Sequence, residues 1–233
     1  MPHFDIVKNN TASPTFRVES IRGTYDLQSR NIEEHFEGNI ELPKKWNIGL
    51  IVGKSGSGKT TIAKELFNDF IVEDFQYTHD SILDDMPKEV TVNDIIMALN
   101  SVGFSSPPNW LKPYSVLSNG EKMRCDIARA ILENKDMFVF DEFTSVVDRN
   151  VAQIGSFALQ KAIRRSDKKF IAVTCHYDVE DWLMPDWVFN TDSMTFYVND
   201  LETLKKKDHQ LKSTFTRQKK KNIIGSNLGS III

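Results

Sequence analysis

The sequence predicts an α/β fold in which helices flank a mostly parallel central sheet. Residues 47–52 form a short apolar, β-branched run, which is typical of a buried parallel strand. A loop rich in glycine and serine follows, and residues 60–69 then carry apolar side chains at helical spacing. Two further apolar runs, residues 137–140 and 170–174, predict two more buried strands. Alternation of such strands with helices is characteristic of an α/β domain.

The segment before the first buried strand is predicted to be β structure. Residues 15–30 alternate apolar and polar positions, which favours one or two strands, and residues 39–42 read as another short one. We therefore expect N-terminal antiparallel strands beside the central sheet.

Composition is that of an ordinary globular protein. The 233 residues include 29 basic and 32 acidic side chains, and 40% are hydrophobic. These proportions exclude a fibrous, collagen-like or largely disordered chain. The length suits one large α/β domain, with or without a small subdomain, whereas two complete enzymatic domains would be crowded.

No stretch of the sequence predicts a membrane span. The longest uninterrupted apolar runs are a handful of residues, far below the roughly 20 that a spanning helix needs. Residues 1–10 are polar where a signal peptide has its apolar core, so we expect a cytoplasmic protein. Cys125 and Cys175 are widely separated and have no metal-ligand spacing, which indicates reduced thiols.

Charge divides the chain unevenly. Residues 199–233 contain eight basic and three acidic side chains, which leaves this end at +5 and residues 1–198 at −8. We assign residues 1–200 to the folded domain and residues 201–233 to a basic, flexible tail. Such a tail can bind nucleic acid or an acidic membrane surface by releasing counterions, or can simply be solvated.

A phosphate-binding motif follows the first buried strand. Residues 53–60 read GKSGSGKT and match G-x-x-x-x-G-K-[ST] without a mismatch. Glycines let backbone N–H groups converge on a phosphate, and the helix that follows directs its positive N-terminus at the same place. Lys59 is expected to reach the β- and γ-phosphates, and the Thr60 hydroxyl to bind Mg²⁺. The residues predicted to bind the nucleotide from this segment are Gly53, Ser55, Gly56, Ser57, Gly58, Lys59, Thr60 and Thr61. The motif alone leaves a small-molecule kinase open.

Four further features occur after this loop. Residues 117–121 read LSNGE and open a helical pattern, and their simplest interpretation is a capping box between Ser118 and Glu121. The strand at residues 137–140 runs directly into Asp141 and Glu142. Residues 145–148 follow, and the strand at residues 170–174 ends just before His176.

Together, in this order and spacing, the features resemble the ATP-binding-cassette (ABC) ATPases. The four segments match the family's signature sequence, the strand ending in two acids, the aspartate loop and the switch histidine. The resemblance covers about residues 15–200. It implies a P-loop NTPase that hydrolyses ATP with Mg²⁺ and works as an ATP-dependent, head-to-tail homodimer.

The resemblance also implies roles for individual residues. Asp141 would hold Mg²⁺ together with Thr60. Glu142 would act as general base on the attacking water, and His176 would contact the γ-phosphate. Asp148 would lie at the dimer interface. The signature residues that would act on the ATP of the opposite subunit are Ser118, Asn119, Gly120 and Glu121.

The sequence departs from the family pattern at several positions. Asn119 stands where glycine is usual and Glu121 where glutamine is usual, and both are compatible with the roles above. Gln76 is the only glutamine between Lys59 and Ser118, and it is early for the family's Mg²⁺-sensing glutamine. Other candidates for that position are Ser81, Asp84 and Asp85.

The helical subdomain is predicted to be small. Ser118 follows Lys59 by 59 positions, which is short for a transporter subunit, and we place this subdomain at about residues 75–133. An aromatic residue before the phosphate loop usually stacks on adenine in the family. Tyr25 is our choice, with Phe16 and Phe36 as alternatives.

The biological task is less defined than the chemistry. The reduced helical segment and the basic tail favour a soluble, non-transport ATPase that works on nucleic acid or a protein. The segment at residues 176–187 resembles that of ABC-type ATPases related to those fused to a predicted acetyltransferase domain. The alternative is the ATP-binding subunit of a transporter, whose membrane partner would be a separate subunit. A third hypothesis is an ATP-gated clamp with slow turnover.

Overall fold

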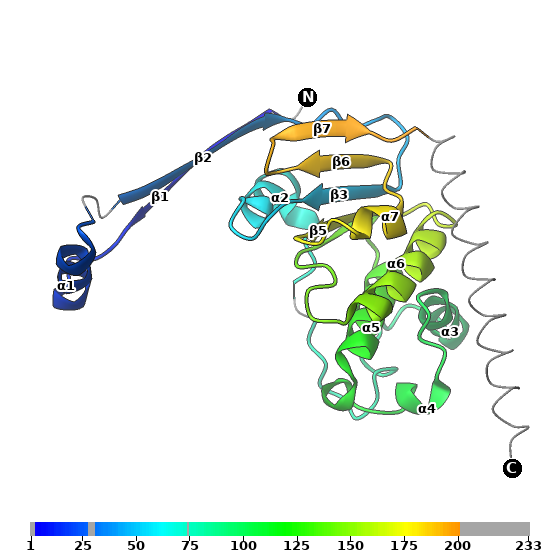
Figure 1. The fold of residues 1–233 in the computed structure, drawn as a ribbon. Coiled ribbons are helices and arrows are strands. Elements are labelled where there is room, and N and C mark those ends of the chain that lie inside the picture. The colour runs from blue at the N-terminus through cyan, green and yellow to red at the C-terminus, as the bar shows by residue number, and fades with distance from the viewer. Residues whose placement is uncertain (1–2, 28–30, 74, 201–233) are drawn as a thin grey trace, which may run out of the picture.

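A five-stranded sheet forms the centre of the molecule (Figure 1). The computed structural model describes residues 3–27, 31–73 and 75–200. Four neighbouring strands of the sheet are parallel, and β7 runs antiparallel to β6 at one edge. The order is β4-β5-β3-β6-β7, with β3 at Ile48–Val52, β4 at Met137–Phe140, β5 at Lys169–Thr174, β6 at Trp187–Asn190 and β7 at Thr195–Val198. The predicted α/β class with a mostly parallel sheet is confirmed.

Helices cover both faces of this sheet (Figure 1). One face packs on α2, whose Ile62 and Phe67 share a buried cluster with Val173 and Trp187. The other face packs on α5 and α6, with α3 beside them, in a second and larger cluster. The helices are α2 Lys59–Phe67, α3 Val92–Ser101, α4 Pro107–Trp110, α5 Asn119–Leu132, α6 Arg149–Ile163 and α7 Val179–Leu183, with 3₁₀ turns at Asn68–Phe70 and Tyr114–Val116.

The N-terminal antiparallel strands exist, but not where the alternation placed them. Strands β1 (His3–Thr11) and β2 (Asn31–Asn39) pair as a hairpin, and helix α1 (Phe16–Tyr25) occupies most of residues 15–30. Strand pairing also ends at Asn39, so the strand predicted at residues 39–42 is wrong. Helix capping outweighs the weak alternation of apolar and polar residues in this segment. Thr15 caps the start of α1 by accepting a hydrogen bond from the backbone N–H of Val18, and Asp26 ends the helix in the left-handed conformation.

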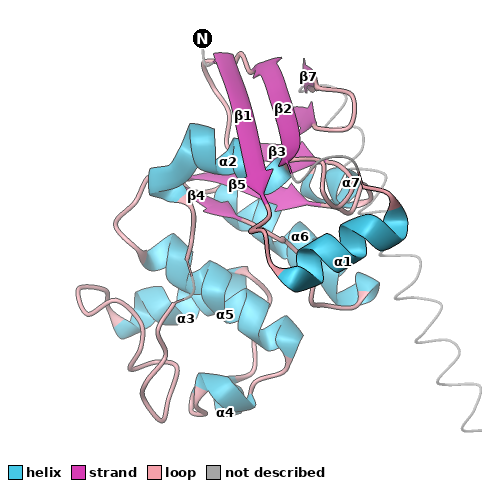
Figure 2. Ribbon diagram, turned by 90° about the vertical axis from the view of Figure 1, so that its left-hand side faces the viewer, coloured by secondary structure: helices cyan, strands magenta, loops and turns pink. Residues whose placement is uncertain are grey.

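The hairpin is attached to the sheet at one end only. Phe4 and Phe36 are buried near its root, where the Phe4 ring meets Phe189 edge-on at 5.7 Å. Figure 1 places α1 at the opposite end of the hairpin, away from the central sheet, and Figure 2 shows β1 and β2 side by side. No residue of α1 is buried, and Phe16 is 86% exposed.

The segment predicted as a helical subdomain carries α3, α4 and α5 between residues 92 and 132. Its limits at residues 75 and 133 stay a prediction. The basic tail at residues 201–233 lies outside the described residues. Within the described part of the chain, no helix is both long and apolar enough to cross a membrane. Cys125 is a buried free thiol, whereas Cys175 is half-buried.

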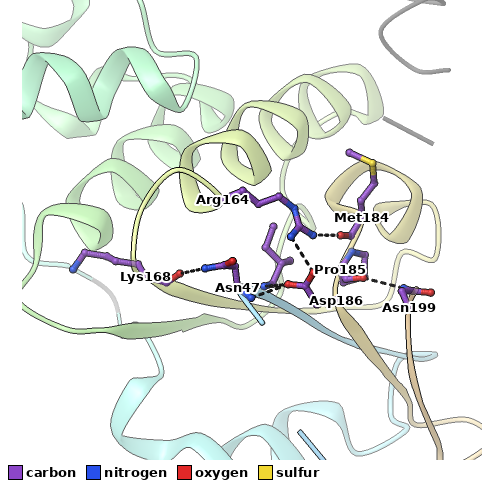
Figure 3. Close-up of polar contacts among 8 residues, drawn as sticks. Asn47, Arg164, Lys168, Met184, Pro185, Asp186 and Asn199 are labelled. Atoms are coloured by element: carbon purple, nitrogen blue, oxygen red, sulfur yellow. Dashed lines mark hydrogen bonds and ion pairs between the residues drawn. The ribbon is translucent and has the colours of Figure 1, made fainter. Parts of the chain in front are cut away.

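A buried carboxylate closes the amino-terminal edge of the sheet (Figure 3). Asp186 is 5% exposed and accepts hydrogen bonds from the backbone N–H groups of Asn47 (2.7 Å) and Ile48 (2.9 Å). Its second oxygen accepts one from Arg164 at 2.9 Å, and Arg164 also donates to the carbonyl of Met184. The network joins the starts of β3 and β6 to the end of α6. It therefore fixes the register of the strand that carries the phosphate loop.

Replacing Asp186 should destabilise the whole domain. Asp186→Ala leaves two buried backbone N–H groups and the Arg164 guanidinium without their acceptor, so we expect a loss of about 3–5 kcal/mol in the free energy of unfolding. Urea denaturation measures it. The matched control is Asp178→Ala, which breaks an exposed ion pair with Arg149 and should cost less than about 1 kcal/mol. Equal stability of the two variants would contradict the structural role of Asp186.

Candidate functional site

Three loops meet at the carboxyl-terminal edge of the parallel strands. The loop after β3 carries the phosphate motif, the loop after β4 carries Asp141 and Glu142, and the loop after β5 carries His176. Strand β5 lies between β4 and β3 and pairs in parallel with both. The three predicted groups therefore lie along one edge of one sheet, which is where open α/β sheets bind ligands.

The phosphate loop has a backbone that only glycine adopts easily. Gly56 and Gly58 both have φ of +82°, and Gly58 is the N-cap of α2. A Cβ on Gly53 would lie 2.1 Å from the Thr191 hydroxyl oxygen, so this position also has no room for a side chain. The loop consequently leads into the N-terminus of a nine-residue helix, which attracts anions through its free N–H groups and its dipole.

Lys59 is held inside this loop. Its side chain is buried to 6% exposure, and Nζ donates a 2.7 Å hydrogen bond to the carbonyl of Lys54. The same carbonyl accepts from the Ser57 hydroxyl at 2.8 Å and from the Ser57 N–H at 3.2 Å. The loop thus positions an ammonium group beside its own N–H groups. Thr60 and Thr61 occupy the first turn of α2 and are half-buried, whereas Ser55 is exposed.

Phe36 is an aromatic residue that packs against the phosphate loop. A Cβ on Gly58 would lie 2.4 Å from the Phe36 ring, so glycine is also required here by close packing. The ring is 8% exposed and belongs to the core on the α2 face. Tyr25, predicted to stack on adenine, instead ends α1 at the far end of the hairpin and is 69% exposed. Phe16 begins the same helix. Neither is placed at the loop.

The acid pair adopts a strained turn. Glu142 has φ of +51°, and its N–H donates to Asp141 Oδ1 at 2.9 Å. The Ser145 hydroxyl donates to Glu142 Oε2 at 2.6 Å. Both acids line a cavity of about 370 Å³, to which Asn119 of α5 also contributes. The turn therefore presents two carboxylates to an open space between the sheet edge and the signature helix.

His176 follows β5, and its backbone N–H donates to the Thr174 hydroxyl at 3.2 Å. The imidazole is half-buried at the same sheet edge as the phosphate loop. Asp148 is exposed and caps α6 by accepting from the N–H groups of Asn150 and Val151 at 3.0 and 3.1 Å. Asp148 thus has a structural contact of its own in addition to its predicted place at an interface.

The signature segment forms the expected capping box. Glu121 accepts hydrogen bonds from the hydroxyl and the N–H of Ser118, at 2.7 and 2.9 Å, and these hold the pKa of Glu121 below its usual range. The Asn119 amide donates to the carbonyl of Val146 at 3.2 Å, which connects the segment to the loop after the acid pair. A Cβ on Gly120 would lie 2.6 Å from Val151 of α6, so glycine here permits close helix packing.

Glu73 is a candidate that the sequence did not reveal. Ile71 forms a parallel bridge to Val139 of β4, and the Val72 N–H donates to the Val139 carbonyl at 2.8 Å. Because of this pairing, Glu73 emerges beside the acid pair and lines the same cavity as Asp141 and Glu142. The signal available in the sequence was the apolar residues 70–72 followed by acids.

The candidates named for the Mg²⁺-sensing position have other contacts. The Ser81 hydroxyl donates to the Trp110 carbonyl at 3.0 Å, and buried Asp85 accepts from His79 at 2.7 Å. The Asp84 N–H donates to the Ser81 carbonyl at 3.2 Å. Gln76 lies four positions after Val72, the last residue that pairs with β4, and its carbonyl accepts a hydrogen bond from Arg129 of α5 at 2.9 Å. Ser81 and Asp85 are thus engaged within the helical part of the chain.

The donor set suits a nucleoside triphosphate with Mg²⁺. Within the described residues, no three His, Cys, Asp or Glu side chains converge as a closed metal site. Mg²⁺ needs no such cage, because it is commonly held by one or two protein oxygens together with phosphate oxygens and water. The Thr60 hydroxyl and the Asp141 carboxylate are oxygens of this kind, and Lys59 supplies a positive charge for the phosphates.

The fold and the arrangement of loops define the class: the part of the chain that the structure describes has the fold of an ABC ATPase cassette. The structure is similar to a dimeric ATP-binding cassette solved in a post-hydrolysis state with ADP and Pi, with a TM-score of 0.55 and 15% identity. That match covers 81% of this chain and 92% of the other. It is also similar to a bacterial Atm1-family ABC exporter with ATP bound, at a TM-score of 0.51 and 20% identity over 74% of this chain and 37% of the exporter.

Parts of the chain are similar in sequence to curated proteins that carry different names. It is 36% identical over 112 residues to Elongation factor 3 of Gonapodya prolifera, which covers 46% of this chain and 9% of that protein. It is 26% identical over 149 residues to the Ribosome protection protein VmlR of Bacillus subtilis, covering 52% and 27%. It is 36% identical over 87 residues to the ATP-dependent lipid A-core flippase of Saccharophagus degradans, covering 36% and 14%. The chain therefore spans only a small part of these relatives, and no protein-family model matches it.

Proposed function

We propose that the chain is an ABC-type ATPase that binds and hydrolyses Mg-ATP. The observation that carries the proposal is the alignment of the phosphate loop, the Asp141–Glu142 turn and His176 at one sheet edge of an ABC cassette fold. In this assignment Lys59 and the loop residues 53–61 hold the phosphates. Thr60 and Asp141 hold Mg²⁺, whose charge stabilises the phosphoryl oxygens. Once these residues hold the phosphates and Mg²⁺, hydrolysis further requires a water positioned to attack the γ-phosphate.

Glu142 is the proposed general base. Its carboxylate lines the cavity at the sheet edge, where it can accept a proton from water that attacks the γ-phosphate. His176, from the neighbouring strand's loop, would donate to the γ-phosphate and orient the water. Glu73 is the best-placed side chain for the position that glutamine occupies in the family, because it lines the same cavity as the acid pair.

The active unit is proposed to be a head-to-tail homodimer. One solved structure with this fold is dimeric. In the proposed dimer, the exposed Ser118 and Asn119 and the half-buried Gly120 at the N-terminus of α5 contact the γ-phosphate bound by the other subunit, and Asp148 lies at the interface. A 14-residue helix directs its positive end at this phosphate.

We favour a non-transport role with a protein or nucleic-acid partner. Two relatives that each match about half of this chain are named an elongation factor and a ribosome protection protein. The projecting β1–β2 hairpin (Figure 1) with its exposed α1 is suited to contact a macromolecule. The finer resemblance to cassettes related to acetyltransferase fusions is part of this proposal, as is a cytoplasmic location. The alternative, a transporter subunit, is favoured by the flippase match and the Atm1-family exporter.

Steady-state hydrolysis of Mg-ATP by the purified protein tests the proposal. Because each site needs two subunits, the rate per subunit should rise with protein concentration and then saturate. Duplex DNA, RNA or ribosomes are then compared with membrane fractions as stimulants. Stimulation by membranes together with co-purification of a membrane protein would favour the transporter alternative. A protein that binds no ATP would contradict both.

A further inference from the structure

The turn after β6 touches the phosphate loop at two points, and neither contact belongs to the motif. Thr191 is buried, and its hydroxyl lies 2.6 Å from that of Ser57. Asp192 Oδ1 accepts a 2.9 Å hydrogen bond from the N–H of Lys54. The missing side chain of Gly53 makes these contacts possible, because a Cβ there would lie 2.1 Å from the Thr191 hydroxyl and 3.2 Å from Asp192 Oδ1.

Tyr177 reaches the same carboxylate from the other side of strand β3. Its hydroxyl donates a hydrogen bond to Asp192 Oδ2. Strand β3 lies between β5 and β6 in the sheet, Tyr177 follows β5 and Asp192 follows β6. The Tyr177–Asp192 contact therefore crosses the end of β3, at the point where the chain enters the phosphate loop.

The Lys54 peptide connects this contact to the lysine of the motif. Its N–H donates to Asp192, and its carbonyl accepts from Lys59 Nζ at 2.7 Å and from the Ser57 hydroxyl at 2.8 Å. A shift of this one peptide would thus move the Lys54 carbonyl, to which the Lys59 ammonium group is hydrogen-bonded. Lys59 is the residue that is proposed to bind phosphate. Tyr177 is also the residue next to His176, so the same contact ties the histidine loop to the phosphate loop.

Electrostatics agree with a charged, acceptor-only Asp192. The hydrogen bonds from Tyr177 and from the Lys54 N–H, together with the charges of Lys54 and Lys59, hold the pKa of Asp192 below its usual range. The Tyr177 pKa is raised, since its hydroxyl donates to that carboxylate. Both groups keep the protonation states that the contact requires at neutral pH.

We propose that Tyr177 and Asp192 form a strap across the root of the phosphate loop, which positions the Lys54 peptide and through it Lys59 for ATP. This inference rests on the proposed function. Tyr177 and Asp192 act here as positioning residues, not as groups that contact the nucleotide. Neither residue lies within the phosphate motif, and we expect both to raise the affinity for ATP by positioning the loop.

Separate variants remove the Tyr177 hydroxyl and the Asp192 carboxylate, the two groups that form the strap. Tyr177→Phe removes the hydroxyl and keeps the ring, and Asp192→Ala removes the acceptor. Asp192→Asn can keep both contacts, because its amide oxygen can accept from the Lys54 N–H and its amide N–H can donate to the Tyr177 hydroxyl oxygen. Tyr197→Phe is the matched control, because the Tyr197 hydroxyl donates to Glu180 at 2.9 Å on an exposed surface away from the loop. Each variant is assayed for Mg-ATP affinity, KM and kcat.

We expect the first two variants to raise KM and the dissociation constant for Mg-ATP about five- to tenfold, the effect of one hydrogen bond to a charged group at an exposed site. The kcat should stay within about twofold, because the lost positioning affects the bound and transition states alike. Asp192→Asn and Tyr197→Phe should change KM by less than about twofold. The double variant Tyr177→Phe/Asp192→Ala should be no weaker than Asp192→Ala alone, since both remove the same contact.

Hydrogen exchange gives a test that does not depend on ATP. The Lys54 amide should exchange faster in Asp192→Ala and in Tyr177→Phe than in the wild-type protein or Tyr197→Phe. Unchanged exchange at Lys54, or an unchanged KM in both strap variants while the wild-type protein binds ATP normally, would overturn the strap. If the Lys54 amide exchanges faster in the strap variants but the wild-type protein binds no ATP, the strap is supported and the proposed function is contradicted.

Discussion

Lys59→Ala should lower the affinity for Mg-ATP by at least about 100-fold. The reason is that the Lys59 ammonium group is buried and held within the loop by the Lys54 carbonyl, where it supplies the positive charge that is proposed to bind the phosphates. Loss of charge-assisted hydrogen bonds to two phosphates accounts for this magnitude. Titration with a fluorescent ATP analogue, with competition by ATP, measures it.

The control for this variant is Lys64→Ala. Lys64 lies on the same helix but is exposed, so its removal should leave ATP affinity within about twofold of the wild type. Circular dichroism checks that both variants are folded. An ATP affinity in folded Lys59→Ala equal to that of the wild type would show that this loop does not bind the phosphates.

Glu142→Gln should reduce the turnover of ATP by about 100-fold or more while ATP stays bound. The amide keeps the size of the side chain and can still accept from Ser145, but it cannot take a proton from water. Because hydrolysis normally ends the dimeric state in the proposed cycle, the variant should accumulate as an ATP-bound dimer. Single-turnover hydrolysis and size-exclusion chromatography with and without Mg-ATP measure the two effects.

Glu133→Gln is a suitable comparison. Glu133 lies at the end of α5, where it pairs with Arg129 at 3.8 Å, and its replacement should affect neither turnover nor association. Wild-type hydrolysis by Glu142→Gln would assign the base to another group. Glu73 would then be the first carboxylate to test, because it lines the same cavity.

The parts of the site that lie within one short segment could be predicted from the sequence. The phosphate loop is one contiguous segment. Its glycines, lysine and threonine match a known motif, so residues 53–60 alone predict the local backbone conformation. The capping box of Ser118 and Glu121 is likewise local and is confirmed. Capping also explains the failure at residues 15–30, where Thr15 and Asp26 delimit a helix that the alternation of apolar residues concealed.

Features that depend on strand order could not be predicted in this way. Phe36 lies under Gly58, Glu73 emerges beside Asp141, and Tyr177 meets Asp192 across β3, and each of these contacts joins segments that are distant in sequence. Tyr25 shows the same limit, because an aromatic residue at a plausible sequence distance ends up at the far end of the hairpin.

The class of fold, the phosphate motif and the acid pair follow from local sequence, since hydrophobic period and backbone conformation act over a few residues. Which side chains surround that motif follows only from the tertiary structure. Packing and sheet order bring β5 and β6 to either side of β3, and a one-strand change in that order would separate Tyr177 from Asp192 without altering either residue's local sequence.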